Sequence, residues 1–194
     1  MKKHLTKLFA ILSALSILAS SLLLCACSRT PNYKKYRIEK NKIDTVTVGD
    51  KEITGYFFLI KDGSAVVELC DSENNVLQSM SFPAEGNEYY TSLDFSFAFK
   101  EAKFQDMNFD QHLDLYIPLS VTTPNLEGMA WLWDTENSAF VLSEELSKLY
   151  ELTVFPDEKM ITSNDYSSPD GIVCSEYKWE DGKLTKVNEY TVTN

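Results

Sequence analysis

Five residues with oxygen ligands stand at regular spacing near the middle of the chain. Four offer side-chain oxygens at positions 1, 3, 5 and 9 of one segment, and position 7 offers its backbone carbonyl; in chain order these are Asp106, Asn108, Asp110, His112 and Asp114. Calcium takes six to eight oxygen ligands, and alternate residues of a tight loop can direct their oxygens at one centre. The spacing therefore predicts a Ca²⁺-binding loop at 106–114, with an affinity on the order of 10⁻⁴ M or weaker.

Strands are expected to hold this loop at both ends. Residues 93–100 alternate apolar and polar side chains, and residues 113–117 have the composition of a strand. Gln111 stands where such loops usually have glycine, and Ile117 stands where an EF-hand has glutamate, so a helix-loop-helix site is disfavoured. The alternative is a solvated acidic turn without metal, because Asp and Asn are common turn residues.

The N-terminus has the composition of an export signal. Three lysines are followed by an apolar run from Leu8 to Leu24, which is short for a membrane span. The run ends in Leu24-Cys25-Ala26-Cys27, which resembles a bacterial lipobox and predicts a signal peptide at 1–26 and lipidation of Cys27. The alternatives are an ordinary secreted protein and an uncleaved anchor. We expect the protein in the cell envelope, attached to a bacterial membrane outside the cytoplasm.

Charge divides the rest of the chain into two parts. Residues 28–42 hold six basic residues and one acidic residue, which suits a tether beside an anionic membrane surface. Residues 43–194 hold nine of the 18 basic residues and 28 of the 29 acidic ones, a net charge of −19. Nucleic-acid binding needs clustered Lys and Arg and is therefore not expected of this domain. A basic protein partner suits it better.

The domain at 43–194 is long enough for one core, and short apolar segments recur in it between turn signals. Gly49-Asp50, Asp62-Gly63 and Asp181-Gly182 are typical of tight hairpins. The pattern predicts an all-β fold, a mostly antiparallel meander of ten to twelve strands that is sandwich-like or propeller-blade-like. One short helix is expected near 144–150, with Ser143 as its N-cap. No internal repeat is obvious.

The sequence offers little for catalysis. After Cys27 the chain has a single histidine, His112, and it has no G-x-S-x-G motif, no His/Cys cluster and no glycine-rich phosphate loop. We therefore expect a protein that is not an enzyme, with Ca²⁺ as its only cofactor. Paired carboxylates of a glycosidase stay a third possibility, because the domain holds many acids.

Two further groups of residues have open interpretations. Cys70 and Cys174 lie in strand-like segments, and export would permit a disulfide between them, but two buried thiols are equally compatible with the sequence. Trp131 and Trp133 alternate on one face of a strand, where core packing is favoured over an exposed binding face.

Several segments together resemble a family of small bacterial lipoproteins. The resemblance is to immunity lipoproteins and periplasmic lysozyme inhibitors that carry one calcium loop akin to FG-GAP/VCBS repeats. It covers roughly residues 100–183 and rests on Phe104-x-Asp106-x-Asn108-Phe-Asp110-x-x-x-Asp114-Leu, Trp131-Leu-Trp-Asp, Phe140-Val-Leu-Ser-Glu-Glu-Leu146, Ile161-Thr-Ser163 and Tyr177-Lys-Trp-Glu-Asp-Gly-Lys183.

The resemblance implies a role in binding a protein. Related inhibitors insert a Ser-x-x-Tyr-like loop into the enzyme cleft, and Ser163-Asn-Asp-Tyr166 matches that pattern, although a strand end followed by a turn has the same composition. We expect a lipid-anchored, non-enzymatic calcium-binding domain that binds a protein partner and neutralises a lysozyme-like cell-wall hydrolase. The alternative is a surface module that binds a solute or glycan, in which the tryptophans would be exposed.

Overall fold

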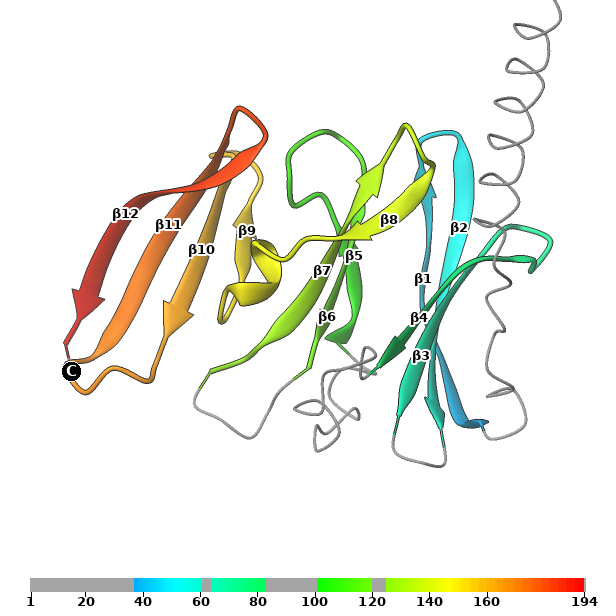
Figure 1. Ribbon diagram of the computed structural model, residues 1–194, viewed down its shortest axis with the longest axis horizontal. Helices are drawn as coiled ribbons and strands as arrows, with labels where there is room; N and C mark the ends of the chain where they lie inside the picture. Colours follow the sequence, from blue (N-terminus) through cyan, green and yellow to red (C-terminus); the bar gives the residue numbers. More distant parts are fainter. Residues whose placement is uncertain (1–36, 61–63, 83–100, 120–124, 194) are drawn as a thin grey trace, which may run out of the picture. The chain divides into compact units, whose positions relative to one another are not determined.

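The computed structural model describes residues 37–60, 64–82, 101–119 and 125–193. In them, twelve strands form three four-stranded antiparallel sheets, each a meander in chain order, and the predicted all-β class is confirmed (Figure 1). The first sheet contains β1 (Arg37–Val48), β2 (Lys51–Ile60), β3 (Ala65–Cys70) and β4 (Val76–Phe82). The middle sheet contains β5 (Lys103–Gln105), β6 (Asp114–Pro118), β7 (Gly128–Asp134) and β8 (Ala139–Leu142). The last sheet contains β9 (Thr153–Phe155), β10 (Met160–Asp165), β11 (Ile172–Glu180) and β12 (Lys183–Val192).

The central strands of the middle sheet, β6 and β7, are buried on both faces. Successive side chains of a strand point to opposite faces of its sheet. Leu115, Ile117 and Trp131 accordingly join the core cluster that includes the first sheet, whereas Tyr116 and Ala130 join the cluster that includes the last sheet. Burial on both sides explains why β6 and β7 are continuous apolar runs without alternating polar residues.

Aromatic side chains pack where the first and middle sheets meet. Trp133 meets Phe140 edge to face with ring centroids 5.1 Å apart, and Phe104 lies 6.1 Å from Phe140. Gly55 of β2 permits this packing, because a Cβ there would lie 3.1 Å from the ring of Phe104. Trp131 and Trp133 are each only 6 % exposed, which confirms the prediction that they belong to the core.

Two hairpins reveal a repeat that the sequence alone did not make obvious. The turn between β3 and β4 reads Asp71-Ser-Glu-Asn-Asn75, and the turn between β7 and β8 reads Asp134-Thr-Glu-Asn-Ser138. In both, the first Asp accepts backbone N–H groups of its own turn and a side-chain amide of the following Asn. The repeated turn joins the third and fourth strands of the first sheet and of the middle sheet.

The first strand begins earlier than the sequence suggested. Residues 37–42 were predicted to be part of the tether, but they form the start of β1 and pair with β2. Backbone pairing needs no apolar side chains, and the ammonium of Lys40 lies 3.6 Å from the ring centroid of Tyr56. A basic composition was therefore compatible with a strand.

The helix expected near 144–150 is present only as a 3-10 turn, η3 (Leu146–Lys148). The N-cap residue is Glu145 and not the predicted Ser143, although the Oγ of Ser143 accepts the N–H of Leu146 at 3.3 Å. Leu146, Leu149 and Leu152 are all buried in the cluster shared with the last sheet. The turn ends at Leu149, whose backbone is already extended (φ −87°, ψ 133°), so the helix does not continue to residue 150.

A candidate metal-binding loop

The predicted calcium loop lies between β5 and β6, with Asp114 as the first residue of β6. The expected strand after the loop is therefore confirmed, whereas the one expected at 93–100 lies outside the described residues. Phe109 and Gln111 have left-handed backbone angles, with φ of 61° and 73°. Gln111 thus adopts the conformation for which calcium loops usually use glycine, and its N–H donates to Asp106 Oδ2 at 2.9 Å.

Short-range hydrogen bonds organise the exposed part of the loop. Asn108 Oδ1 accepts the N–H of Asp110 at 3.1 Å, and Asp110 Oδ1 accepts the N–H of His112 at 2.8 Å. The amide of Asn108 also donates to Asp110 Oδ2 at 2.9 Å. The predicted ligands are therefore brought together within one turn, with several of their oxygens engaged by backbone donors.

Asp114 has a different environment, because it is completely buried. Its Oδ2 accepts the N–H of Met107 at 2.7 Å and its Oδ1 accepts the N–H of Trp133 at 2.9 Å. Burial is the main reason that its pKa rises to about 7; the charges of Asp110 and Asp106 act in the same direction, and the two N–H groups oppose it. The carboxylate of Asp114 therefore connects the loop to β7, and its pKa depends on the charges of Asp106 and Asp110.

The residues fit a calcium ion in their chemistry. Asp106 Oδ1 is buried and has no hydrogen-bond partner among the described residues. A buried acceptor without a donor is costly unless something else satisfies it. No group of three or more His, Cys, Asp or Glu side chains in the described ranges is arranged to hold a metal. A calcium ion in this loop would therefore need the Asn108 amide oxygen and the His112 carbonyl in addition to carboxylates. Mixed sets of carboxylate, amide and carbonyl oxygens are common for calcium.

Two residues outside the predicted set of ligands anchor the loop to the core. Met107 is fully buried, although it stands between Asp106 and Asn108. Its carbonyl accepts the indole N–H of Trp179 in β11 at 2.9 Å. An apolar residue in the middle of an acidic loop was the available signal. Trp179 belongs to the Tyr177–Lys183 segment of the resemblance, but nothing in the sequence connects it with Met107, 72 residues earlier.

Ser163 and Tyr166, predicted as partner contacts, are placed differently from each other. Ser163 lies in β10 and is only 7 % exposed, and its hydroxyl donates to the carbonyl of Tyr150 at 2.8 Å while accepting the N–H of that residue. Tyr166 is 40 % exposed, and its N–H donates to Asn125 Oδ1 at 2.6 Å. Only Tyr166 is thus presented to solvent.

The cysteines fall into separate parts of the fold. Cys70 is buried in β3 of the first sheet, Cys174 is half-buried in β11 of the last sheet, and no disulfide is formed between them. The predicted lipidation site Cys27 and the signal peptide lie outside the described residues. Within those residues, no helix is both long enough and apolar enough to span a bilayer.

Comparison with known proteins gives a limited result. No family model matches the chain, and no curated protein matches it. A solved structure, described as a Xanthomonas type IV secretion system related protein, is similar with a TM-score of 0.48 and 13 % sequence identity. The match covers 78 % of this chain and 87 % of that one.

Proposed function

We propose that this protein is an exported, lipid-anchored β-domain that is stabilised by calcium, has no catalytic activity and binds a protein partner. The partner would be a basic cell-wall hydrolase of the lysozyme type, which the domain neutralises. The observation that carries the calcium part is the loop itself: Asp106 and Asp110 lie close enough to raise the pKa of buried Asp114, and Asp106 Oδ1 is buried without a donor. A bound cation would satisfy the unpaired Asp106 Oδ1 and would offset the repulsion among the three carboxylates.

Charge supports the choice of partner. Residues 43–194 carry a net charge of −19, so a cationic protein is attracted and anionic polymers are repelled. Tyr166, exposed at the end of β10, is a candidate contact for the partner. The alternative of a glycan-binding module loses its main support, because Trp131 and Trp133 are core residues and offer no exposed stacking face.

Calcium is expected to stabilise the full chain, studied in a non-ionic detergent. For a dissociation constant on the order of 10⁻⁴ M, 1 mM CaCl₂ adds about 1.4 kcal/mol to the free energy of unfolding. This raises the melting temperature by about 3–6 °C relative to EGTA. Asp110→Ala should abolish the shift, whereas Asp170→Ala, an exposed acid in the turn after β10, should leave it intact. Equal melting temperatures with calcium and with EGTA for the unmodified chain would remove calcium from the proposal.

Partner binding is tested separately with a purified cationic lysozyme. An equimolar amount of the full chain is expected to lower its rate of cell-wall lysis at least tenfold, because a neutralising partner occupies the cleft. Bovine serum albumin, another acidic protein, controls for non-specific charge effects. Lysis at an unchanged rate in a molar excess of the chain would count against the lysozyme-type partner.

A further inference from the structure

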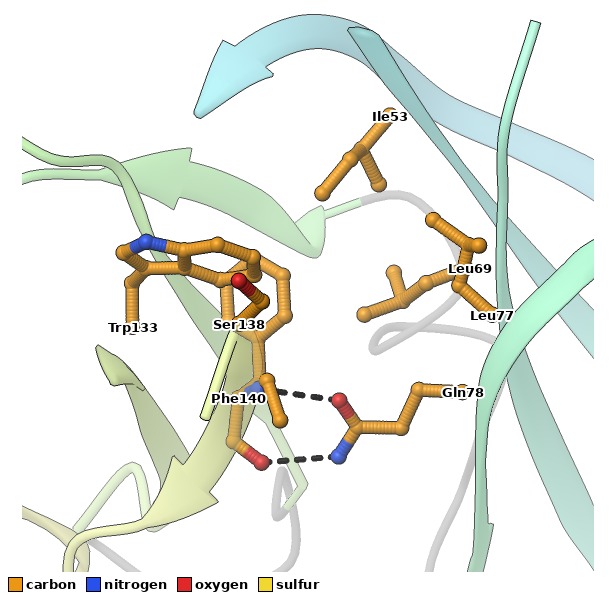
Figure 2. A pocket seen from close by; sticks show the side chains of 8 residues that line it. Ile53, Leu69, Leu77, Gln78, Trp133, Ser138 and Phe140 are labelled. Carbon is orange, nitrogen blue, oxygen red and sulfur yellow. Dashed lines mark hydrogen bonds between the residues drawn. The ribbon is translucent and has the colours of Figure 1, made fainter. Parts of the chain in front are cut away.

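A cavity of about 90 Å³ lies where the first and middle sheets meet. One wall consists of Ile53, Leu69 and Leu77 from the first sheet, and the other includes Trp133 and Phe140 from the middle sheet (Figure 2). Two residues of its lining are exposed, Leu77 (50 %) and Ser138, so the cavity is accessible from solvent.

Gln78 closes one end of the cavity and holds its two walls in place. Its amide nitrogen donates to the carbonyl of Phe140 at 2.7 Å, and its amide oxygen accepts the N–H of the same residue at 2.9 Å (Figure 2). This pair of bonds imitates the pairing of two strands. Because the walls are already fixed, a side chain that enters pays little for reorganising them.

The size of the cavity limits what can enter. An engineered apolar cavity of about 150 Å³ accommodates benzene. A cavity of about 90 Å³ is smaller and suits one branched aliphatic side chain. Its lining is mainly apolar, with the hydroxyl of Ser138 at the exposed edge.

Acidic turns flank the opening on both sides. The β3–β4 turn between Leu69 and Leu77 contributes Asp71 and Glu73, and the β7–β8 turn directly after Trp133 contributes Asp134 and Glu136. Neither turn contains Lys or Arg. Hydrogen bonds from the side chain of Asn75 lower the pKa of Asp71, and those from Asn137 do the same for Asp134, so both carboxylates keep their charge.

We propose that this cavity is a docking site for a cationic protein segment that inserts one aliphatic side chain between the two sheets. The apolar walls receive the inserted side chain, and the four carboxylates of the two turns attract Lys or Arg residues on either side of it. This inference rests on the proposed function, since it names the surface on which a basic partner binds. It can nevertheless be tested without that partner.

Three short peptides serve as probes for the full chain in non-ionic detergent at low salt. Acetyl-Lys-Lys-Leu-Lys-Lys-amide is expected to shift the NMR signals of the Gln78 side-chain amide and the Trp133 indole. Replacing the central Leu by Ser should weaken binding about tenfold, because the buried aliphatic group is lost. A Glu-Glu-Leu-Glu-Glu peptide should produce no shift, because its charge matches that of the turns.

Matched variants locate the site. Leu77→Ser removes the exposed apolar side chain of one wall and is expected to weaken binding of the leucine peptide about fivefold. Val187→Ser changes a similarly exposed apolar residue of β12 and should have no effect. Glu73→Gln with Glu136→Gln should weaken binding and reduce its salt dependence. Glu144→Gln with Glu180→Gln, two exposed acids elsewhere, is the control for net charge.

The outcomes separate this inference from the proposed function. Equal binding of the Leu and Ser peptides, or an unchanged Gln78 signal, would overturn the docking site even if the chain inhibits lysozyme. Selective binding of the leucine peptide that depends on Leu77 would establish the site even if lysozyme is not inhibited, in which case a different cationic protein is the partner.

Discussion

Replacing Asp114 with alanine is expected to lower the free energy of unfolding by about 2–5 kcal/mol in calcium-free buffer. The carboxylate is completely buried and accepts the N–H groups of Met107 and Trp133. Each buried donor left without an acceptor costs about 1–3 kcal/mol. The loss of the buried charge offsets part of this cost, because burial already disfavours the ionised form of Asp114. Urea unfolding in EGTA, followed by Trp fluorescence, measures the change.

Two variants in the same loop make this result interpretable. Asp114→Asn keeps one carbonyl oxygen and the shape of the side chain but sets an amide N–H₂ against one of the two donors, so about half of the loss is expected. Asp110→Ala changes an exposed acid of the same loop and should alter stability by no more than about 0.5 kcal/mol without calcium. If Asp114→Ala unfolds within 1 kcal/mol of the unmodified chain, the carboxylate does not anchor the loop to β7.

Gly128→Ala is expected to lower the free energy of unfolding by about 2–3 kcal/mol through overpacking. A Cβ at Gly128 in β7 would lie 2.5 Å from Cζ and 2.6 Å from Cε2 of Tyr116 on the paired strand β6. Tyr116 is only 4 % exposed, so its ring has little room to move aside. Thermal or urea unfolding in saturating calcium measures the cost without involving the metal loop.

A double-mutant cycle identifies the clash as the cause. Tyr116→Leu removes the ring, so Gly128→Ala should cost at least 1 kcal/mol less in that background. Tyr116→Phe alone should be nearly neutral, because the buried hydroxyl has no hydrogen-bond partner among the described residues. Equal costs of Gly128→Ala in both backgrounds would mean that backbone conformation, and not the contact with Tyr116, requires the glycine.

Much of the fold could be predicted because its signals are local. A turn residue such as Gly182, with φ of 74°, acts within the few residues of its own hairpin. The alternation of side chains along a strand is equally local, which is why the strand that contains Trp131 and Trp133 was assigned to the core. The position of the 106–114 loop between strands followed from the same kind of reasoning. The start of β1 was missed because pairing with β2 depends on backbone groups that every residue has.

The candidate sites were less predictable because their essential contacts join distant parts of the chain. Trp179 reaches the carbonyl of Met107, and Gln78 pairs with the backbone of Phe140 62 residues away. Nothing in the sequence indicates that Trp179 or Gln78 has a partner so far away in the chain. Ser163 was wrongly expected in an exposed loop because of its local motif. In the structure its hydroxyl is hydrogen-bonded to the backbone N–H and carbonyl of Tyr150.

The sequence by itself determined the β class, the hairpin positions, the acidic character of the domain and the order of oxygen ligands in the loop. These properties depend on residue type and on neighbours within a few positions. The tertiary structure alone decided that Asp114 is buried, that the hydroxyl of Ser163 is hydrogen-bonded to the backbone, and that a cavity remains between the acidic turns. Burial and long-range hydrogen bonding depend on how the first and last sheets pack against the two faces of the middle sheet, and that packing brings together residues that no local pattern connects.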